Sequence, residues 1–419
     1  MRLGAHTTWL VYRGVWSFAF AAGWTMAAAF FVRELHMSPL ELVLTGTALE
    51  LGYFLFEVPT GIVADTYGRR RSVLVGLVLV GAGFVVTGLA GSVGVVIAAA
   101  AFTGFGWTFV SGAEDAWLYD EVGGEAVGGA YQRGAQAGRV GSLLGLGAAL
   151  GLALVDLRVP IVAGGATLVV LAGVLALLMP ETGFRPASRD ELGALRGMVR
   201  TGAEGTRLIR ARPLLLLMVG IAFFGGLSKE GFDRLGEAHF LLDVGMPKLA
   251  GLDPVVWFAV LGAGMLVLAI AVAQPLVRRF ERLDRAAMAR TLLLLDATMI
   301  ASTLAFAFTG AFALAVGAYW AINVARSLAG PVYSAWVNSN VDDSRVRATV
   351  ISMTNLGDSV GQWGGGPALG AIGNVFGIRA ALAAGAIVLV PALGLYGRAI
   401  RHHGREPELD HPSPAPVSV

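Results

Sequence analysis

Cysteine is missing from this chain of 419 residues, and charged side chains are scarce, at 14% of the total. Without cysteine there can be no disulfide framework and no metal site with thiolate ligands. The scarcity of charge argues against a soluble protein, since soluble globular domains carry about 25% charged residues. With 56% hydrophobic residues and a mean hydropathy of +0.69, the chain is expected to lie in lipid.

Catalytic and nucleotide-binding signatures are missing too. The six histidines stand at the ends of apolar runs, between them or near the C-terminus, and there is no His-Glu-x-x-His or Walker sequence. We therefore predict no enzyme activity, no metal and no cofactor, and an ATP-driven pump is disfavoured. A net charge of +2 gives no reason to expect a nucleic-acid partner.

Long apolar runs are abundant. A helix that crosses about 30 Å of hydrocarbon needs about 20 apolar residues, and twelve segments meet this requirement. The predicted fold is an all-α integral membrane protein with 12 transmembrane helices. The spans are expected near residues 8–32, 38–62, 72–92, 94–118, 134–155, 159–179, 213–233, 254–276, 288–308, 311–336, 348–373 and 377–398.

An Arg-rich segment at 181–212 separates six spans from six. It places Leu192, Leu195 and Val199 on one helical face, as expected of an interfacial helix on the anionic inner leaflet. The predicted organisation is an N-terminal six-helix bundle at 1–180, this cytosolic linker, a C-terminal six-helix bundle at 213–400 and a disordered cytosolic tail at 401–419.

Basic residues are concentrated in loops that would share one side of the membrane. Arginines stand at 69–71, 185–212, 278–290 and 398–405, whereas the opposite loops hold few. By the positive-inside rule these loops are cytosolic. We therefore predict a multi-pass protein of the cell membrane with both termini in the cytosol. No small-residue cleavage site follows the first apolar run, so we expect no signal peptide.

The two halves echo each other. Small residues recur in span five from Gly141 to Gly151, and in span eleven, its positional counterpart, from Gly364 to Gly373. Such residues let membrane helices approach closely. Repeated halves are typical of transporters, whose substrate sites lie near the bilayer midplane between the repeats.

One charged stretch, GIVADTYGRRRSVL, interrupts the apolar sequence between spans two and three. It resembles the Gly-x-x-x-Asp-x-x-Gly-Arg-Arg signature of the major facilitator superfamily. The matching positions are Gly61, Asp65, Gly68, Arg69 and Arg70. The six-plus-six layout and the long central loop also agree. The resemblance implies two pseudo-symmetric six-helix bundles and secondary transport by alternating access.

Two further stretches, SGAEDAWLYD at 111–120 and MPETGF at 179–184, resemble the bacterial drug-exporter-like branch of the superfamily. Two positions depart from the drug–proton antiporter pattern. Ala100 stands where an Arg is usual, and Leu146 stands where a Pro is usual. These positions do not support the usual antiporter scheme.

The charged stretch also has a physical interpretation. Asp65 lies where span two leaves the hydrocarbon, and its carboxylate can face the positive N-terminal end of span eleven. Asp120 ends span four at the same level and can pair with Arg69 or Arg70. The resemblance implies a latch that joins the two halves when the cytosolic side is shut. The alternative is a plain positive-inside anchor.

Eight ionisable residues are predicted to lie within spans. Each costs about 3 kcal/mol by insertion scales, so they must pair or line water. They are Arg13, Glu50, Glu57, Glu114, Asp115, Asp296, Arg326 and Asp358. Depths calculated at about 1.5 Å per residue predict that Arg13 forms a cluster with Glu57, Glu114 and Asp115, and that Arg326 pairs with Asp358. Structural pairing and a coupling role both remain open for them.

Glu50 differs, because no basic residue of the first half lies at its depth. Burial disfavours the charged form of a carboxyl group, and this suits a proton carrier. The alternative is a Glu that hydrogen-bonds to a Ser or Tyr across a helix contact. The candidates for proton coupling are Glu50, Asp358, Glu114, Asp115 and Glu57.

Span seven is predicted to exit as SKEGFDRLGEAHF, in which Lys229–Asp233 and Glu230–Arg234 are i,i+4 pairs. This is a solvated helix end or, if the helix runs longer, a charged stretch that reaches the cavity. Aromatic side chains in the spans are either cavity walls or interfacial anchors. The candidates are Trp24, Trp107, Tyr319 and Trp320.

The function expected from these features is secondary active transport. We predict proton-coupled efflux of small amphipathic compounds or drugs by a monomer whose partners are the substrate, protons and the lipid bilayer. The alternative is a proton-coupled uptake symporter or a uniporter of a small metabolite. A membrane enzyme is less favoured, since no nucleophile or metal-ligand set is recognisable.

Overall fold

The computed structural model describes residues 3–186, 213–249, 251–280, 283–341 and 344–403, and these residues form helices joined by short connections. The first group of helices comprises α1 (Ala5–Trp24), α2 (Ala27–Arg33), α3 (Pro39–Tyr67), α4 (Arg69–Leu89), α5 (Val93–Val110), α6 (Ala113–Val122), α7 (Gly124–Ala153) and α8 (Arg158–Leu178). The second comprises α10 (Pro213–His239), η2 (Phe240–Val244), α11 (Val256–Leu268), η3 (Ala269–Ala273), α12 (Gln274–Phe280), α13 (Arg285–Phe308), α14 (Phe312–Ser339), α15 (Ser344–Phe376), α16 (Ile378–Val388) and α17 (Val390–His403).

Each of the twelve predicted spans coincides with one of these helices or with consecutive ones. Within the described residues, ten segments are long and apolar enough to cross a membrane. The two spans outside that set are α7, of 30 residues, and α15, of 33 residues. Both begin with polar turns, and this lowers their hydropathy although they pack among the apolar helices.

Local sequence explains where α3 begins and ends. Ser38 and Glu41 form a capping box, in which the Glu41 N–H donates to Ser38 Oγ at 3.4 Å and the Ser38 N–H donates to the Glu41 carboxylate at 2.8 Å. The helix ends at Gly68, whose φ of +117° is unfavourable for residues with a Cβ. This explains the second glycine of the charged motif, because the chain turns there directly into α4.

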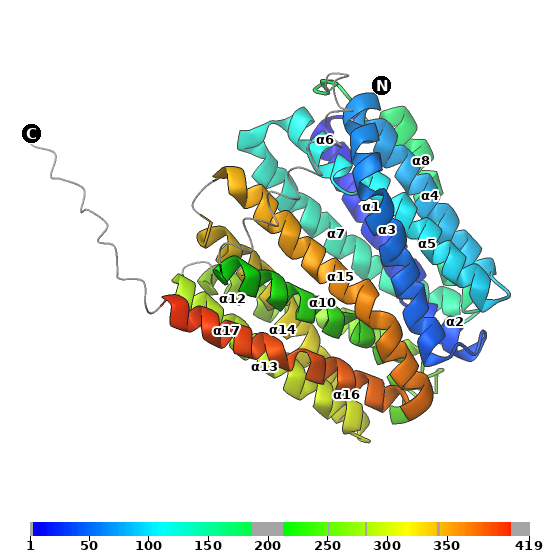
Figure 1. The fold of residues 1–419 in the computed structure, drawn as a ribbon. Coiled ribbons are helices and arrows are strands. Elements are labelled where there is room, and N and C mark those ends of the chain that lie inside the picture. Colours follow the sequence, from blue (N-terminus) through cyan, green and yellow to red (C-terminus); the bar gives the residue numbers. More distant parts are fainter. Residues whose placement is uncertain (1–2, 187–212, 250, 281–282, 342–343, 404–419) are drawn as a thin grey trace, which may run out of the picture.

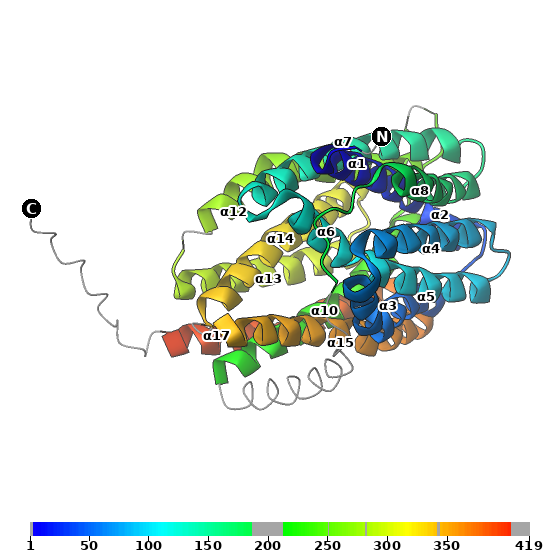
Figure 2. The ribbon, with the colours of Figure 1, turned by 90° about the horizontal axis from the view of Figure 1, so that it is seen from above.

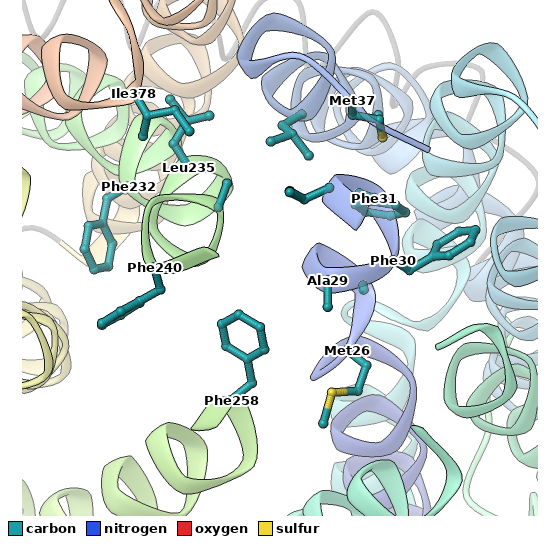
Figure 3. Packing of buried hydrophobic residues seen from close by; sticks show 14 of the residues in the cluster. Met26, Ala29, Phe30, Phe31, Met37, Phe232, Leu235, Phe240, Phe258 and Ile378 are labelled. Carbon is teal, nitrogen blue, oxygen red and sulfur yellow. The ribbon is translucent and has the colours of Figure 1, made fainter. Parts of the chain in front are cut away.

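The helices form two groups that diverge from a common end (Figure 1). The helices α3 and α15 lie side by side as the main contact between the groups, also in the view from above (Figure 2). One hydrophobic cluster draws on both groups and includes Phe30 and Phe31 from the first and Phe240 and Phe258 from the second (Figure 3). This common apolar core lies at the end of the molecule that contains α2.

The remaining buried side chains form two separate clusters. One belongs to α1–α8 and contains Phe84 and Trp117, and the other belongs to the second group and contains Trp336 and Tyr396. The start of α1 and the end of α17 lie at the end where the groups diverge (Figure 1). Among the described residues, the hydrophobic cluster that both groups share therefore lies at one end of the molecule.

The predicted small-residue stretches lie at helix contacts, as expected. A Cβ added at Gly145 of α7 would meet α1 at the Phe18 carbonyl, at 2.5 Å. A Cβ at Gly370 of α15 would meet α3 at the Leu40 Cα, at 2.9 Å. Because the helix axes approach this closely, larger side chains would push them apart.

Two predicted segments fall largely outside the description. The predicted interfacial helix lies in 187–212, and residues 404–419 of the predicted tail are also not described. Residues 401–403 were expected in the tail, but they form the last turn of α17. The amphipathic pattern of this helix extends the last span beyond its predicted end.

Candidate functional site

The charged residues of span seven lie inside the helix rather than at its exit. The helix α10 runs to His239 and continues as the π-helical segment η2 to Val244. The sequence SKEGFDRLGEAHF therefore belongs to the apolar segment Pro213–Val244, and Glu230 is only 1% exposed. The interpretation as a solvated helix end is wrong, because α10 and η2 continue to Val244 within one segment that is apolar enough to span a membrane.

The ion pairs of the second group differ from those that sequence spacing suggested. Lys229 Nζ donates to both carboxylate oxygens of Asp358, at 2.9 and 3.1 Å. Arg326 makes two hydrogen bonds to the carboxylate of Asp233, the second of them at 2.8 Å. The predicted pairs Lys229–Asp233 and Arg326–Asp358 are therefore wrong. Each carboxylate instead faces a cation on a neighbouring helix.

The third pair, Glu230–Arg234, is confirmed, with Nε and Oε1 3.1 Å apart. It presses against α3 of the first group, because a Cβ added at Gly46 would collide with both side chains. Glu50 lies one turn further along α3, and the charge of Arg234 acts on it. Glu50 thus has a cation nearby after all. The cation comes from the second half of the chain, whereas the prediction considered basic residues of the first half.

The predicted cluster around Arg13 is smaller in the structure. Arg13 lies 3.5 Å from Glu114, so this pair is confirmed. Glu57 and Asp115 are exposed, and Glu57 accepts a hydrogen bond from the Tyr53 hydroxyl at 2.8 Å. Glu57 and Asp115 therefore do not complete a cluster with Arg13. The rotation of their helices points these two carboxylates away from Arg13.

The charged motif brings together residues of three segments. Arg69 binds the Asp120 carboxylate, as predicted, and the Ala116 carbonyl at 2.8 Å. Asp65 is 55% exposed in its side chain and lies 3.7 Å from Arg69. The N–H of Arg70 donates to Glu181 at 2.8 Å. Sequence reasoning missed Glu181, although the surrounding MPETGF had been singled out.

Gly61, the first glycine of the charged motif, makes no close helix contact, because a Cβ added there would meet nothing within 4 Å among the described atoms. Arg70 also donates to the Ala176 carbonyl of α8. All these contacts lie within the first group of helices. They hold α3, α4, α6 and the chain after α8 together at the divergent end.

Two of the predicted aromatic residues line a cavity. Trp24 and Trp107 border a pocket of about 180 Å³, together with Phe20 and Phe84, and Arg234 reaches into it from α10. Trp320 differs, since its indole N–H donates to the Leu261 carbonyl at 3.2 Å. Trp320 therefore fastens α14 to α11.

A second cavity, of about 580 Å³, lies within the second group of helices. Lys229, Asp296, Arg326 and Asp358 line it. Asp296 was expected among the charge pairs, but it has no ion pair or hydrogen bond with any described residue. Within the described ranges, no group of His, Asp and Glu is suited to hold a metal ion.

A further intergroup pair lies at the end that contains α2. Arg33 donates to Asp253, in the segment before α11, at 2.8 Å. Partial burial acts to raise the pKa of Asp253, but hydrogen bonds from the Val255 N–H and from Arg33 lower it below its usual range. Sequence reasoning missed this pair, since 220 residues separate its members.

The arrangement is thus two helix groups with charged side chains at their junction. A family model described as Major Facilitator Superfamily matches residues 14–362. The chain belongs to the major facilitator superfamily. No curated protein matches the sequence. The charged motif and the close packing of α3 against α15 are therefore features of a membrane transporter of this superfamily.

Solved structures of superfamily transporters share the fold. An inward-facing, unoccupied bacterial homologue of the human lysosomal transporter Spinster is 18% identical, with a TM-score of 0.72 over 95% of this chain and 96% of that one. The nucleoside transporter NupG is 12% identical, with a TM-score of 0.77 over 94% and 100%. A POT family transporter in complex with 5-aminolevulinic acid is 13% identical, with a TM-score of 0.68 over 94% and 95%. At these identities the likeness shows the fold.

Proposed function

We propose that this membrane transporter exports small amphipathic compounds in exchange for protons, by alternating access. Twelve helices cross the cell membrane as bundles 1–180 and 213–400, and both termini lie in the cytosol. The divergent end carries the Arg-rich motif and therefore faces the cytosol. The shared core with Phe30 and Phe240 then closes the outer side. In this proposed orientation, the divergence of the groups on the cytosolic side supports an inward-facing state.

The observation that carries the proposal is the junction of Glu50 with Glu230 and Arg234. These residues come from both helix groups: Arg234 pairs with Glu230, and Glu50 lies one turn along α3 from Gly46, against which both side chains pack. When Glu50 is ionised, Arg234 is attracted to both acids. When Glu50 is protonated, Arg234 is attracted mainly to Glu230 on its own helix. A proton on Glu50 therefore changes the attraction between the groups, which is what coupling requires.

The first cavity favours an amphipathic substrate. Its walls are mostly aromatic, and one charged group, Arg234, points into them. Ligand pockets commonly combine apolar walls with a few placed polar groups. Lys229, Arg326 and Asp358 line a second cavity within the second group, so polar groups for a substrate are present there too. The resemblance to the drug-exporter-like branch favours export over uptake.

Transport in reconstituted vesicles tests the proposal. The purified chain is inserted into liposomes, a pH gradient of either sign is imposed, and a panel of dyes and antibiotics is followed across the membrane. The expected result is that substrate and protons cross the membrane in opposite directions. Movement in the same direction as protons identifies the uptake symporter instead. Transport that ignores the gradient identifies a uniporter.

A further inference from the structure

The cavity of about 580 Å³ lies wholly within the second helix group, because all its lining residues fall between Ile221 and Tyr396. It extends from Lys229 and Asp358 at the group's inner face to Asp296 on α13. Its volume is within the range of about 300–1,000 Å³ that is typical of small-molecule sites. It is separate from the aromatic pocket bordered by Trp24 and Trp107.

Asp296 lines this cavity and is 5% exposed. No described residue gives it a hydrogen bond or an ion pair. The two cations of the lining are already engaged, since Lys229 binds Asp358 and Arg326 binds Asp233. A buried carboxylate without a partner is unfavourable. When it is ionised, Asp296 therefore adds a negative charge that neither cation of the lining compensates, and a bound cation would favour this ionised form.

The rest of the lining suits an organic cation. Tyr333 and Tyr396 present aromatic rings to the cavity, and ring faces attract ammonium groups. The Tyr333 hydroxyl donates to the Met218 carbonyl at 2.8 Å, so its ring is held in place by α10. Buried carbon surface together with one carboxylate matches an amine or quaternary ammonium group attached to an apolar body.

We propose that this cavity binds a small organic monocation, with Asp296 as the counter-ion. The inference rests on the proposed function and deepens it, because the cation would be the charged end of an amphipathic substrate. Asp296 acts here through its charge, so a neutral group of the same shape would not replace it.

The absence of native cysteine makes a direct binding test possible. Ser327 lines the cavity on α14, and Ser327→Cys provides a single thiol there for N-ethylmaleimide. The probes are benzyltrimethylammonium and neopentylbenzene, which have the same shape and differ in charge. The rate of labelling of the full-length purified chain is measured at pH 8 with each probe. Ser92→Cys, at an exposed position outside the cavity, is the control thiol.

We expect the cation to protect Ser327→Cys at concentrations at least tenfold lower than the neutral probe, and neither probe to protect the control. Adding Asp296→Asn should raise the protecting concentration of the cation at least tenfold and leave that of the neutral probe unchanged. Adding Asp296→Glu should preserve the preference for the cation. The unchanged response to the neutral probe shows that the variants are folded.

Equal protection by both probes overturns the inference, as does protection that survives Asp296→Asn or no protection by the cation. The result is independent of any gradient. Charge-selective protection without pH-driven transport leaves this site standing and rejects the proposed function. Proton-driven export without charge-selective protection rejects this site and leaves the proposed function standing.

Discussion

Lys229 of α10 donates hydrogen bonds to both carboxylate oxygens of Asp358 on α15, at 2.9 and 3.1 Å. This pair ties the two helices that pack together within the second group, and Gln362 adds a further hydrogen bond to Asp358 at 2.7 Å. Arg326 forms its ion pair with Asp233 instead. The sequence suggested Lys229–Asp233 and Arg326–Asp358, whereas the structure pairs Lys229 with Asp358 and Arg326 with Asp233.

The first prediction concerns this exchange of partners. In a double-mutant cycle, Lys229→Gln and Asp358→Asn should be coupled by about 0.5–1 kcal/mol in the free energy of unfolding. The pair is partly exposed, at 40% and 29%, so a larger value is not expected. Thermal unfolding in detergent provides the measurement. Arg326→Gln with Asp358→Asn is the comparison cycle, and stronger coupling there would restore the pair that sequence spacing suggested.

The second prediction concerns the contact of Gly46 with Glu230 and Arg234. Gly46→Ala places a methyl group against both side chains, and overpacking of this kind costs about 1–3 kcal/mol. The unfolding midpoint should fall by a few degrees. Gly173→Ala on α8 is the matched control, because no described atom lies within 4 Å of the added Cβ. Equal midpoints for the two variants would show that the groups do not meet closely at Gly46.

The third prediction concerns coupling. The glutamine side chain in Glu50→Gln cannot gain or lose a proton, so this variant should abolish pH-driven efflux while ligand binding remains measurable. Proton-gradient-driven efflux and equilibrium binding are measured side by side. Glu57→Gln, seven residues further along α3 and exposed, should keep most of the efflux. Normal efflux by Glu50→Gln would end this assignment and move attention to Asp358 or to Glu114 and Asp115.

The fourth prediction concerns the proposed latch. Asp65 is half exposed and bound only to Arg69 among its described neighbours, so Asp65→Asn should leave the inward-facing state nearly unchanged. It should weaken closure of the cytosolic side, because a carboxylate at a helix N-terminus contributes about 0.3–1 kcal/mol, and up to about 2 when partly buried. Distances between spin labels across that side measure the closed population. A population equal to wild type would leave only the anchor interpretation.

The fifth prediction concerns the pair Arg33–Asp253 at the end that contains α2, which is the outer side in the proposed orientation. Asp253→Asn should increase opening of the outer side by up to about fivefold, since exposed pairs contribute about 0.2–1 kcal/mol. Because the pKa of Asp253 is lowered in the paired state, the contribution is complete above the usual pKa of an Asp and is lost as the pH falls through the lowered value. Wild type should therefore open more only in strong acid.

Spin-label distances across the outer side at several pH values measure this opening. Arg158→Gln is the control, because Arg158 pairs with Glu34 inside the first group at the same end, at 2.8 Å. It should not change the distances. Opening by Arg158→Gln as large as that by Asp253→Asn would mean that the intergroup pair has no special role.

The membrane class, the helices and their contacts of small residues could be predicted because each depends on local sequence. Apolar runs of sufficient length require helices in lipid, since every backbone polar group must be satisfied internally. The glycines of α7 and α15 predict close packing, whichever helix lies against them. The charged motif was recognisable because its spacing is fixed within one loop, and the Arg69–Asp120 pair followed from the shared depth of two helix ends.

Only the tertiary structure decided the partners of the charges within the membrane. Depth along a helix follows from residue counting, but pairing also depends on how each helix is rotated and which helix it faces. For that reason Lys229 reaches α15, Arg326 reaches α10, and Glu57 turns away from Arg13. Arg234 could be placed beside Glu50 only once the two halves were docked, because a long-range electrostatic contact leaves no periodic trace in the sequence.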